Sequence, residues 1–316
     1  MMAESSIPVD LFNPGQVFAC MGFLEAAEVL LGEAECGFDW QNNAQTHFRL
    51  KASGVENPFA VVLKFLTEAE VIRCAPIGYT DSAQNQNKKS STDSEDEDET
   101  TLSRNLSLSE SYPNREGDRT ALPVQMKTNE AHCVNLTHWA DGSSRYDFKL
   151  YAGNRSAYGI ACAMLHGTRE KPKKKQAIGD IKTRGVINLW VEQQDDLIKK
   201  PFDVLTLMGG SFNFDPRGGW TALDAGYSPN KHKHHGIAAS PVVELLAALG
   251  LEHARPHEYE TRQIRYSVWG HLVPPILTRP ALACANMAIP IRRFRFTLAL
   301  SGKNKVVTFA NEETNQ

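Results

Sequence analysis

The sequence predicts an α+β fold: a mixed, mainly antiparallel sheet with helices packed on it, and a disordered acidic insertion. Segments with helical and strand-like periodicity intermix without the regular alternation of a doubly wound parallel sheet. Residues 81–119 are rich in Ser, Asp, Glu and Asn and lack a periodic apolar face. Such a composition cannot offset the entropy lost on ordering. We expect residues 1–80 and the basic segment 120–316 to form one compact unit around this insertion.

Three segments are bracketed by helix start and stop signals. Asn13 can cap the first helix, Pro14 suits its first position, and Gly32 can close its end. A second helix is predicted for 154–167, bracketed by Asn and Gly, and a third for 240–250, which is apolar on most sides and therefore buried. The first helix has one apolar face, formed at three- and four-residue steps by Val17, Phe18, Met21, Leu24, Ala27 and Leu31.

Strand-like alternation of apolar and polar residues recurs through the chain. In the clearest case, Phe294 and Phe296 point to one face while Arg293 and Arg295 point to the other with Thr297. Strands are predicted for residues 46–52, 58–65, 145–151, 211–215, 262–269 and 291–300.

The small net charge hides a strong asymmetry along the chain. The 316 residues carry 34 Lys and Arg against 37 Asp and Glu, a net charge of −3. Residues 1–80 hold 4 basic and 10 acidic side chains, whereas residues 145–305 hold 24 and 13. A basic rear half indicates contact with a polyanion over one part of the surface. The alternative is that these cations only solvate an ordinary exterior.

Several classes of protein are excluded or disfavoured by missing features. The six cysteines form no Cys-x-x-Cys pair, which argues against a zinc knuckle or a disulfide scaffold. The apolar stretch 16–31 is interrupted by Gly and Glu, and the start lacks the pattern of a secretory signal. The sequence also lacks the common nucleotide-loop, hydrolase and metalloprotease motifs. We therefore expect a soluble cytoplasmic protein that is not an enzyme and has no cofactor.

The densest cluster of chemistry-bearing residues spans 212–235. Aromatic rings interleaved with cations suit single-stranded nucleic acid, because rings stack on bases while cations meet phosphates. Alternatively, the two phenylalanines belong to the core, the tryptophan pins a loop, and the cations solvate a turn. The predicted contacts here are Arg217, Lys231, His232 and Lys233 for the backbone and Trp220 or Tyr227 for stacking.

The histidines of the same cluster leave a second chemistry open. His232, His234 and His235 could bind a transition metal and support a metal-dependent nuclease or an RNA-processing enzyme. A hydrolytic site usually adds carboxylates, and the nearest acidic residues are Asp224 and Glu244. No metal site is therefore predicted.

Further candidate contacts lie outside that cluster. Arg293 and Arg295 form a row of guanidiniums that can fork onto phosphates, although an exposed sheet face commonly looks the same. Arg155, at a helix start, is a weaker candidate. Asn213 and Asn230 could read base edges.

Several blocks of the chain together resemble the compact large subunit family of type I-U (I-G) CRISPR–Cas effector complexes. The opening block spans residues 9–27 and contains Asn-Pro-Gly-Gln at 13–16 and the run Phe-Ala-Cys-Met-Gly-Phe-Leu-Glu at 18–25. The other blocks are Gly-Phe-Asp-Trp at 37–40, Asp-Phe-Lys-Leu-Tyr-Ala-Gly-Asn at 147–154, Phe-Asn-Phe-Asp-Pro-Arg at 212–217, Gly-Tyr-Ser-Pro-Asn-Lys-His at 226–232, and Ser-Pro-Val-Val-Glu-Leu-Leu-Ala at 240–247.

The resemblance implies a non-catalytic subunit of a Cascade surveillance complex. Its partners would be other Cascade subunits, CRISPR RNA and target DNA, with no membrane. It would aid protospacer-adjacent-motif recognition and R-loop formation, and would favour recruitment of a helicase–nuclease. The chain departs from longer large subunits by ending in strands (291–309) rather than in a helical bundle. Besides a nucleic-acid-binding subunit and a metal-dependent enzyme, a third hypothesis is a structural scaffold whose basic half binds an acidic partner protein.

Overall fold

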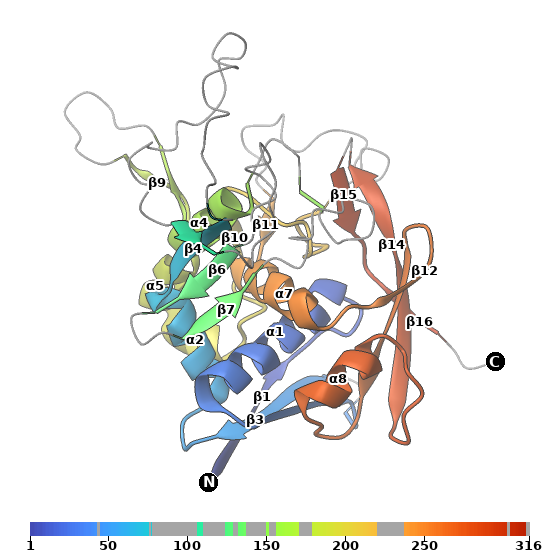
Figure 1. Ribbon diagram of the computed structural model, residues 1–316. Coiled ribbons are helices and arrows are strands. Elements are labelled where there is room, and N and C mark those ends of the chain that lie inside the picture. The colour runs from blue at the N-terminus through green and yellow to red at the C-terminus, as the bar shows by residue number, and fades with distance from the viewer. Residues whose placement is uncertain are drawn as a thin grey trace.

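Two helices, α1 (Pro14–Leu31) and α7 (Pro241–His253), lie against one another at the centre of the fold (Figure 1). The computed structural model describes residues 1–42, 45–75, 77, 106–109, 124–128, 132–136, 150–151, 156–170, 179–219, 237–301 and 304–313. Helices and mostly antiparallel sheets surround the central pair, which confirms the predicted α+β class. One cluster of buried side chains runs from Ile7 to Ala310, so the two ends of the chain share a core.

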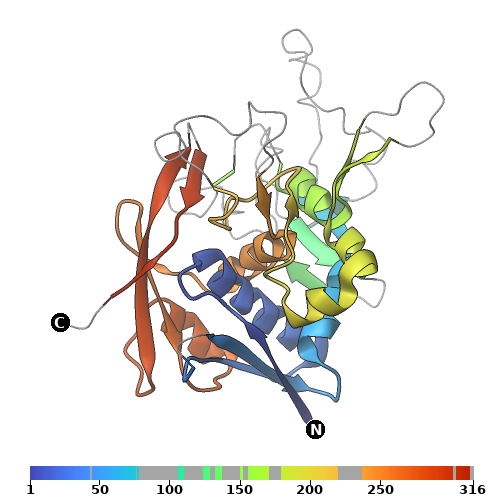
Figure 2. The same cartoon turned by 180° about the vertical axis from the view of Figure 1, so that it is seen from behind.

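Three larger sheets enclose the central helices. The order is β1–β3–β2 beneath α1, β5–β4–β6–β7 on the side of α2, α4 and α5, and β12–β13–β14–β15 on the opposite side, where β16 also pairs with β14 (Figures 1 and 2). The strands are β1 (Met2–Pro8), β2 (Ala34–Asp39), β3 (His47–Ser53), β4 (Glu70–Ala75), β5 (Leu106–Leu108), β6 (Val124–Lys127), β7 (Cys133–Asn135), β8 (Thr168–Arg169), β9 (Ile181–Thr183), β10 (Thr206–Leu207), β11 (Ala238–Ala239), β12 (His257–Glu260), β13 (Gln263–Trp269), β14 (Ile291–Ser301), β15 (Asn304–Val307) and β16 (Asn311–Glu312). The remaining helices are α2 (Pro58–Glu68), α4 (Ala157–His166), α5 (Val186–Lys199) and α8 (Pro275–Leu282).

Helix α1 begins and ends as predicted, but it is buried all round rather than along one face. The Asn13 side chain accepts a hydrogen bond from the Gln16 amide, and Gly32 closes the helix with φ of 71°. Every residue from Pro14 to Ala27 is buried. Helices or sheets pack on each side of α1, so the expectation of a single apolar stripe was wrong.

Two glycines allow α1 and α7 to approach backbone to backbone. A Cβ atom on Gly22 would overlap the carbonyl of Leu246, and one on Gly250 would overlap the carbonyl of Phe18. Gly250 was predicted to end the third helix. It lies inside α7 instead, because the close contact requires glycine there and the helix continues to His253.

The strand predicted for 58–65 is helix α2. The Asn57 side chain accepts from the Phe59 amide, and Pro58 takes the first helical position, so the start signal matches that of α1. The buried residues recur at helical spacing: Phe59, Val62, Leu63 and Leu66.

Several other predicted elements are present with shifted boundaries, and two predicted strands are not formed by the described residues. Strands β3, β13 and β14 match predicted strands, and α4 ends at Gly167 as expected. Its cap is Ser156, whereas Asn154 lies outside the described residues. Residues 211–215 form no strand because Asn213 turns the chain with φ of 68°. Of the predicted strand 145–151, the structure describes Leu150 and Tyr151, which lie outside any strand.

Within the predicted insertion 81–119, the structure describes residues 106–109. Leu106–Leu108 form β5, which pairs in parallel with β4. The expected disorder therefore does not extend to these three residues. The rest of the insertion lies outside the described residues.

Among the described helices, α1 has the length and apolar composition that could cross a membrane. In this structure α1 instead forms the centre of the core, with polar side chains such as Gln16 and Glu25 among its buried residues. Its apolarity therefore matches its role as the helix on which the surrounding elements pack.

The glycine contact predicts a stability effect. We expect Gly22→Ala to lower the free energy of unfolding by about 2 kcal/mol, because the added methyl group meets the rigid backbone of α7. Urea unfolding followed by circular dichroism measures this. Val29→Ala removes an exposed side chain from the same helix and should change little. Equal stability of Gly22→Ala and the wild type would contradict the close contact.

Candidate nucleic-acid interface

Strand β14 carries alternating arginine and phenylalanine side chains on opposite faces. Phe294 and Phe296 are buried, whereas Arg293 is partly exposed and Arg295 is exposed. Tyr266 of β13 stacks on Phe294, with ring centroids 5.5 Å apart, and contacts Phe18 of α1. Packing of the inner face against the core therefore places the guanidiniums on the other face of the sheet, which α8 covers in part through Ser267.

The register of the sheet adds a third arginine to this face. Strand β13 runs antiparallel to β14, with Arg265 directly opposite Arg295 and Ser267 opposite Arg293. We call Arg265, Arg293 and Arg295 the arginine row. Like charges directly opposite one another on a sheet are destabilising, so this row favours binding of an anion.

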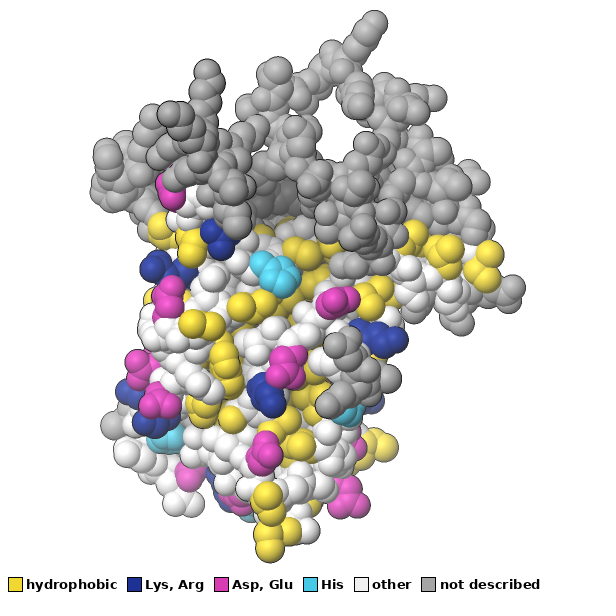
Figure 3. All heavy atoms as spheres, turned by 90° about the vertical axis from the view of Figure 1, so that its left-hand side faces the viewer, with side chains coloured by type: hydrophobic (Ala, Val, Ile, Leu, Met, Phe, Trp, Pro, Cys, Tyr) yellow, Lys and Arg dark blue, Asp and Glu magenta, His cyan; other side chains and the backbone are white. Residues whose placement is uncertain are grey.

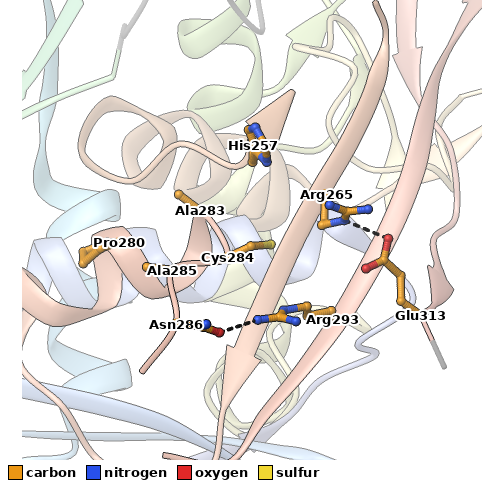
Figure 4. A pocket seen from close by; sticks show the side chains of 9 residues that line it. All are labelled: His257, Arg265, Pro280, Ala283, Cys284, Ala285, Asn286, Arg293 and Glu313. Carbon is orange, nitrogen blue, oxygen red and sulfur yellow. Dashed lines mark hydrogen bonds and ion pairs between the residues drawn. The ribbon is translucent and has the colours of Figure 1, made fainter. Parts of the chain in front are cut away.

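One side of the row borders a hollow of about 700 Å³ between the sheet and the end of α8 (Figure 4). Arg293 Nη2 donates to Asn286 Oδ1 at 3.0 Å, and Arg265 Nε donates to Glu313 Oε1 at 2.8 Å. The C-terminal end of α8 contributes a partial negative charge of about half an elementary charge, which is small against the two guanidiniums there. The lining residues are His257, Arg265, Pro280, Ala283, Cys284, Ala285, Asn286, Arg293 and Glu313.

An aromatic ring accompanies the arginines. The Arg265 guanidinium carbon lies 4.5 Å from the centre of the Tyr259 ring, a cation–π contact. Tyr259 is partly exposed and comes from β12, the neighbouring strand. The site thus combines guanidiniums with an aromatic ring, two kinds of group that proteins use to bind single-stranded nucleic acid.

Cys284 lines the hollow but does not supply a reactive thiolate. Burial raises the pKa of the thiol above its ordinary value, and the nearby Arg265 and Arg293 oppose this only in part. Because the thiol stays protonated at neutral pH, it contributes an uncharged wall to the hollow. The described residues of the site can bind and orient an anion.

Other arginines of the basic half serve internal or surface ion pairs. Arg184 pairs with Glu192, Arg279 with Glu25, and Arg292 with Glu312. On the face that carries α2 and α5, acidic, basic and apolar side chains are interspersed among the described residues (Figure 3). The excess of positive charge in the sequence therefore does not by itself define a contact surface.

Arg217, a predicted backbone contact, is engaged inside the fold. Its guanidinium bonds both oxygens of buried Asp215, and Nη1 donates to the Phe202 carbonyl at 2.8 Å. The Asp215 carboxylate also accepts from Asn13 Nδ2 and from the Ser240 amide, at the starts of α1 and α7. Arg217 therefore compensates a buried charge that joins two helix ends, which withdraws it from phosphate contact.

Asn213, a predicted base reader, is also engaged internally. Its Nδ2 donates to the Leu150 carbonyl at 3.0 Å, and its own carbonyl accepts from the Val307 amide. The left-handed backbone at Asn213 suits an asparagine in a turn. The side chain supports the loop and does not point to a groove edge.

Glu244 of α7 completes this buried set. Its Oε1 accepts from the amides of Phe214 and Asp215, at 3.1 and 2.8 Å. Burial raises the pKa of Glu244 to about 7, and the neighbouring Asp215 charge adds to the rise. We call Asn13, Asp215, Arg217, Ser240 and Glu244 the Asp215 cluster. It orders the loop 211–219 on the ends of both central helices.

The remaining predicted site residues lie outside the described part of the chain. The structure therefore brings together Arg293 and Arg295 of the predicted set and adds Arg265 and Tyr259, which sequence reasoning missed. Alternation within the predicted strand 262–269 exposes Arg265, but only the register places it opposite Arg295. The predicted site residues that lie outside the described part of the chain are Arg155, Trp220, Tyr227, Asn230, Lys231, His232 and Lys233, together with His234 and His235.

Within the described ranges, no group of three or more His, Cys, Asp or Glu side chains is placed to hold a metal ion. No protein-family model, curated protein or solved structure matches the chain.

The buried carboxyl of Glu244 predicts a pH dependence of stability. Its pKa is about 7 in the folded protein and near 4.5 when unfolded, so its protonation stabilises the fold at low pH and this contribution is lost as pH rises through 7. Relative to Glu244→Gln, the wild type should lose about 2 kcal/mol of unfolding free energy between about pH 5 and pH 8.

Urea unfolding of both proteins at the two pH values measures this difference. Glu56→Gln removes an exposed carboxylate and should follow the wild-type profile. Parallel profiles for wild type and Glu244→Gln would show that Glu244 titrates as an ordinary carboxyl.

Proposed function

We propose that this protein is a non-catalytic, nucleic-acid-binding subunit of a type I CRISPR Cascade surveillance complex in the cytoplasm. The observation that supports it best is the arginine row on the outer face of the C-terminal sheet. Three guanidiniums share that face with the ring of Tyr259, and Glu313 is the described carboxylate bonded to the row.

The spacing of the row suits a chain of phosphates. Alternate side chains on a strand lie about 7 Å apart along it, so Arg293 and Arg295 present separate guanidiniums along one line. Each can form two parallel hydrogen bonds to a phosphate. The contact would be to the backbone and independent of base sequence, as expected of a subunit that holds RNA or displaced DNA while base pairing reads the sequence.

The resemblance to the compact large subunit family supplies the biological setting of the proposal. In that setting the protein joins other Cascade subunits on CRISPR RNA, aids protospacer-adjacent-motif recognition and R-loop formation, and favours recruitment of a helicase–nuclease. Residues of the segment 220–236 remain proposed contacts, with Trp220 and Tyr227 for stacking and Lys231–Lys233 for phosphates. Arg217 and Asn213 are left out, because their side chains are engaged inside the fold.

The first prediction concerns affinity. We expect the full-length double variant Arg293→Ala, Arg295→Ala to bind a labelled oligothymidylate about tenfold more weakly than wild type, with the slope of log affinity against log salt reduced by about 2. Fluorescence anisotropy over a salt series measures both quantities.

The matched control removes two cations from the opposite side of the molecule. Arg184→Ala, Lys199→Ala makes the same change in net charge beside α5, where both side chains are exposed. It should retain most of the affinity. Equal losses of affinity in the two double variants would show that the effect depends on net charge alone and would contradict the proposed interface.

The second prediction concerns the complex. Affinity capture of the tagged full-length chain from its native host should recover small RNA with CRISPR repeat sequences and several partner proteins. Sequencing of the bound RNA and mass spectrometry of the proteins test this. Recovery of partner proteins without nucleic acid would favour a scaffold that docks acidic proteins.

A further inference from the structure

Glu313 forms a single-bonded ion pair at the edge of the hollow. One bond links its Oε1 to Arg265 Nε at 2.8 Å, and both side chains are partly exposed. The segment that carries Glu313 is held by the two-residue strand β16 and by a bond from the Glu313 amide to the Arg293 carbonyl. Little structure therefore has to be disrupted for this carboxylate to move.

The neighbouring residue provides a contrast within the same strand. Glu312 accepts two bonds from Arg292, both at 2.7 Å, and Arg292 also lies over the rings of Trp40 and Phe294. Two-point pairing of arginine with carboxylate is the stronger arrangement. Glu312 is thus paired with Arg292, outside the hollow, whereas Glu313 is paired with Arg265, an arginine of the hollow that can bind another anion.

The arginine row holds more positive charge than Glu313 neutralises. Arg265 and Arg295 are directly opposite one another, and Arg293 lines the same hollow as Arg265. The other walls are small and mostly apolar, formed by Pro280, Ala283 and neighbouring residues, and suit the flat, uncharged part of a ligand (Figure 4). About 700 Å³ is within the usual range for a small-molecule site.

We propose that this hollow binds a phosphate ester between Arg265 and Arg293, and that Glu313 occupies Arg265 until the phosphate displaces it. A phosphate offers several acceptor oxygens and can engage both guanidiniums at once, whereas Glu313 engages one. Binding a strand phosphate there rests on the proposed function, while binding a free nucleotide does not. The carboxylate lowers affinity for the anion through competition for Arg265 and through charge repulsion.

The test compares two adjacent glutamates in the full-length chain. Glu313→Gln should tighten binding of a labelled oligothymidylate about threefold or more, because it removes the competing charge. Glu312→Gln makes the same change one residue earlier, outside the hollow, and should leave affinity near wild type. Thermal unfolding of both variants verifies that each is folded.

A double-mutant cycle tests whether Glu313 acts through Arg265. In an Arg265→Gln background, most of the gain from Glu313→Gln should disappear, because the guanidinium that the two anions share is gone. A full gain in that background would show that Glu313 acts by general repulsion and would overturn the proposed competition for Arg265.

Adenosine monophosphate serves as the second ligand and separates the two sources of phosphate. Tighter binding of the oligonucleotide supports a strand phosphate, and tighter binding of the monophosphate alone, by calorimetry, identifies a free nucleotide as the ligand. Unchanged binding of both ligands in Glu313→Gln would overturn the site. Wild-type protein that binds no oligonucleotide would count against the proposed function, whatever the glutamate variants show with the monophosphate.

Discussion

The burial of α1 on all sides is the constraint on which the other elements depend. Because α1 is surrounded by protein, both helices and sheets pack against it. Each of these elements contacts a different residue of α1. Gly22 admits the backbone of α7, Phe23 packs edge-on against Phe59 of α2, and Phe18 contacts Tyr266 of β13. The inner face of the C-terminal sheet is therefore fixed to the core, and its arginines are held outward on a rigid element.

An arginine compensates a buried carboxylate at two places around the same helix. Asp215 lies at the start of α1 and collects bonds from Arg217, Asn13 and the Ser240 amide. Farther along α1, Glu25 accepts two bonds from Arg279 of α8. Each arginine compensates a carboxylate that would be costly to bury alone. These arginines count toward the basic rear half of the sequence, yet they belong to the fold.

The sequence predicts well what depends on neighbours along the chain. Asn13-Pro14 and Ser240-Pro241 mark helix starts, and alternation in β14 separates Arg293 and Arg295 from the phenylalanines. Asn57-Pro58 carries the same start signal, although the segment that follows it was predicted to be a strand. Local pattern alone cannot give the partner of Asp215, which lies 202 positions away at Asn13, or the strand register that sets Arg265 opposite Arg295.

The difference between local pattern and long-range contacts decides which arginines can bind a ligand. An arginine is available to phosphate when its guanidinium faces solvent and its internal partner is absent or easily displaced. Alternation along a strand indicates the first condition, but the second depends on contacts between residues far apart in the sequence. Arg217 lies in the motif with the strongest appearance of a binding loop, but its carboxylate partner is fully buried and shared with two helix ends. Arg295 lies in an ordinary strand and is exposed. The proposed nucleic-acid contact therefore depends first on the sheet, where the packing of Phe294 and Phe296 inward leaves Arg293 and Arg295 on the opposite face.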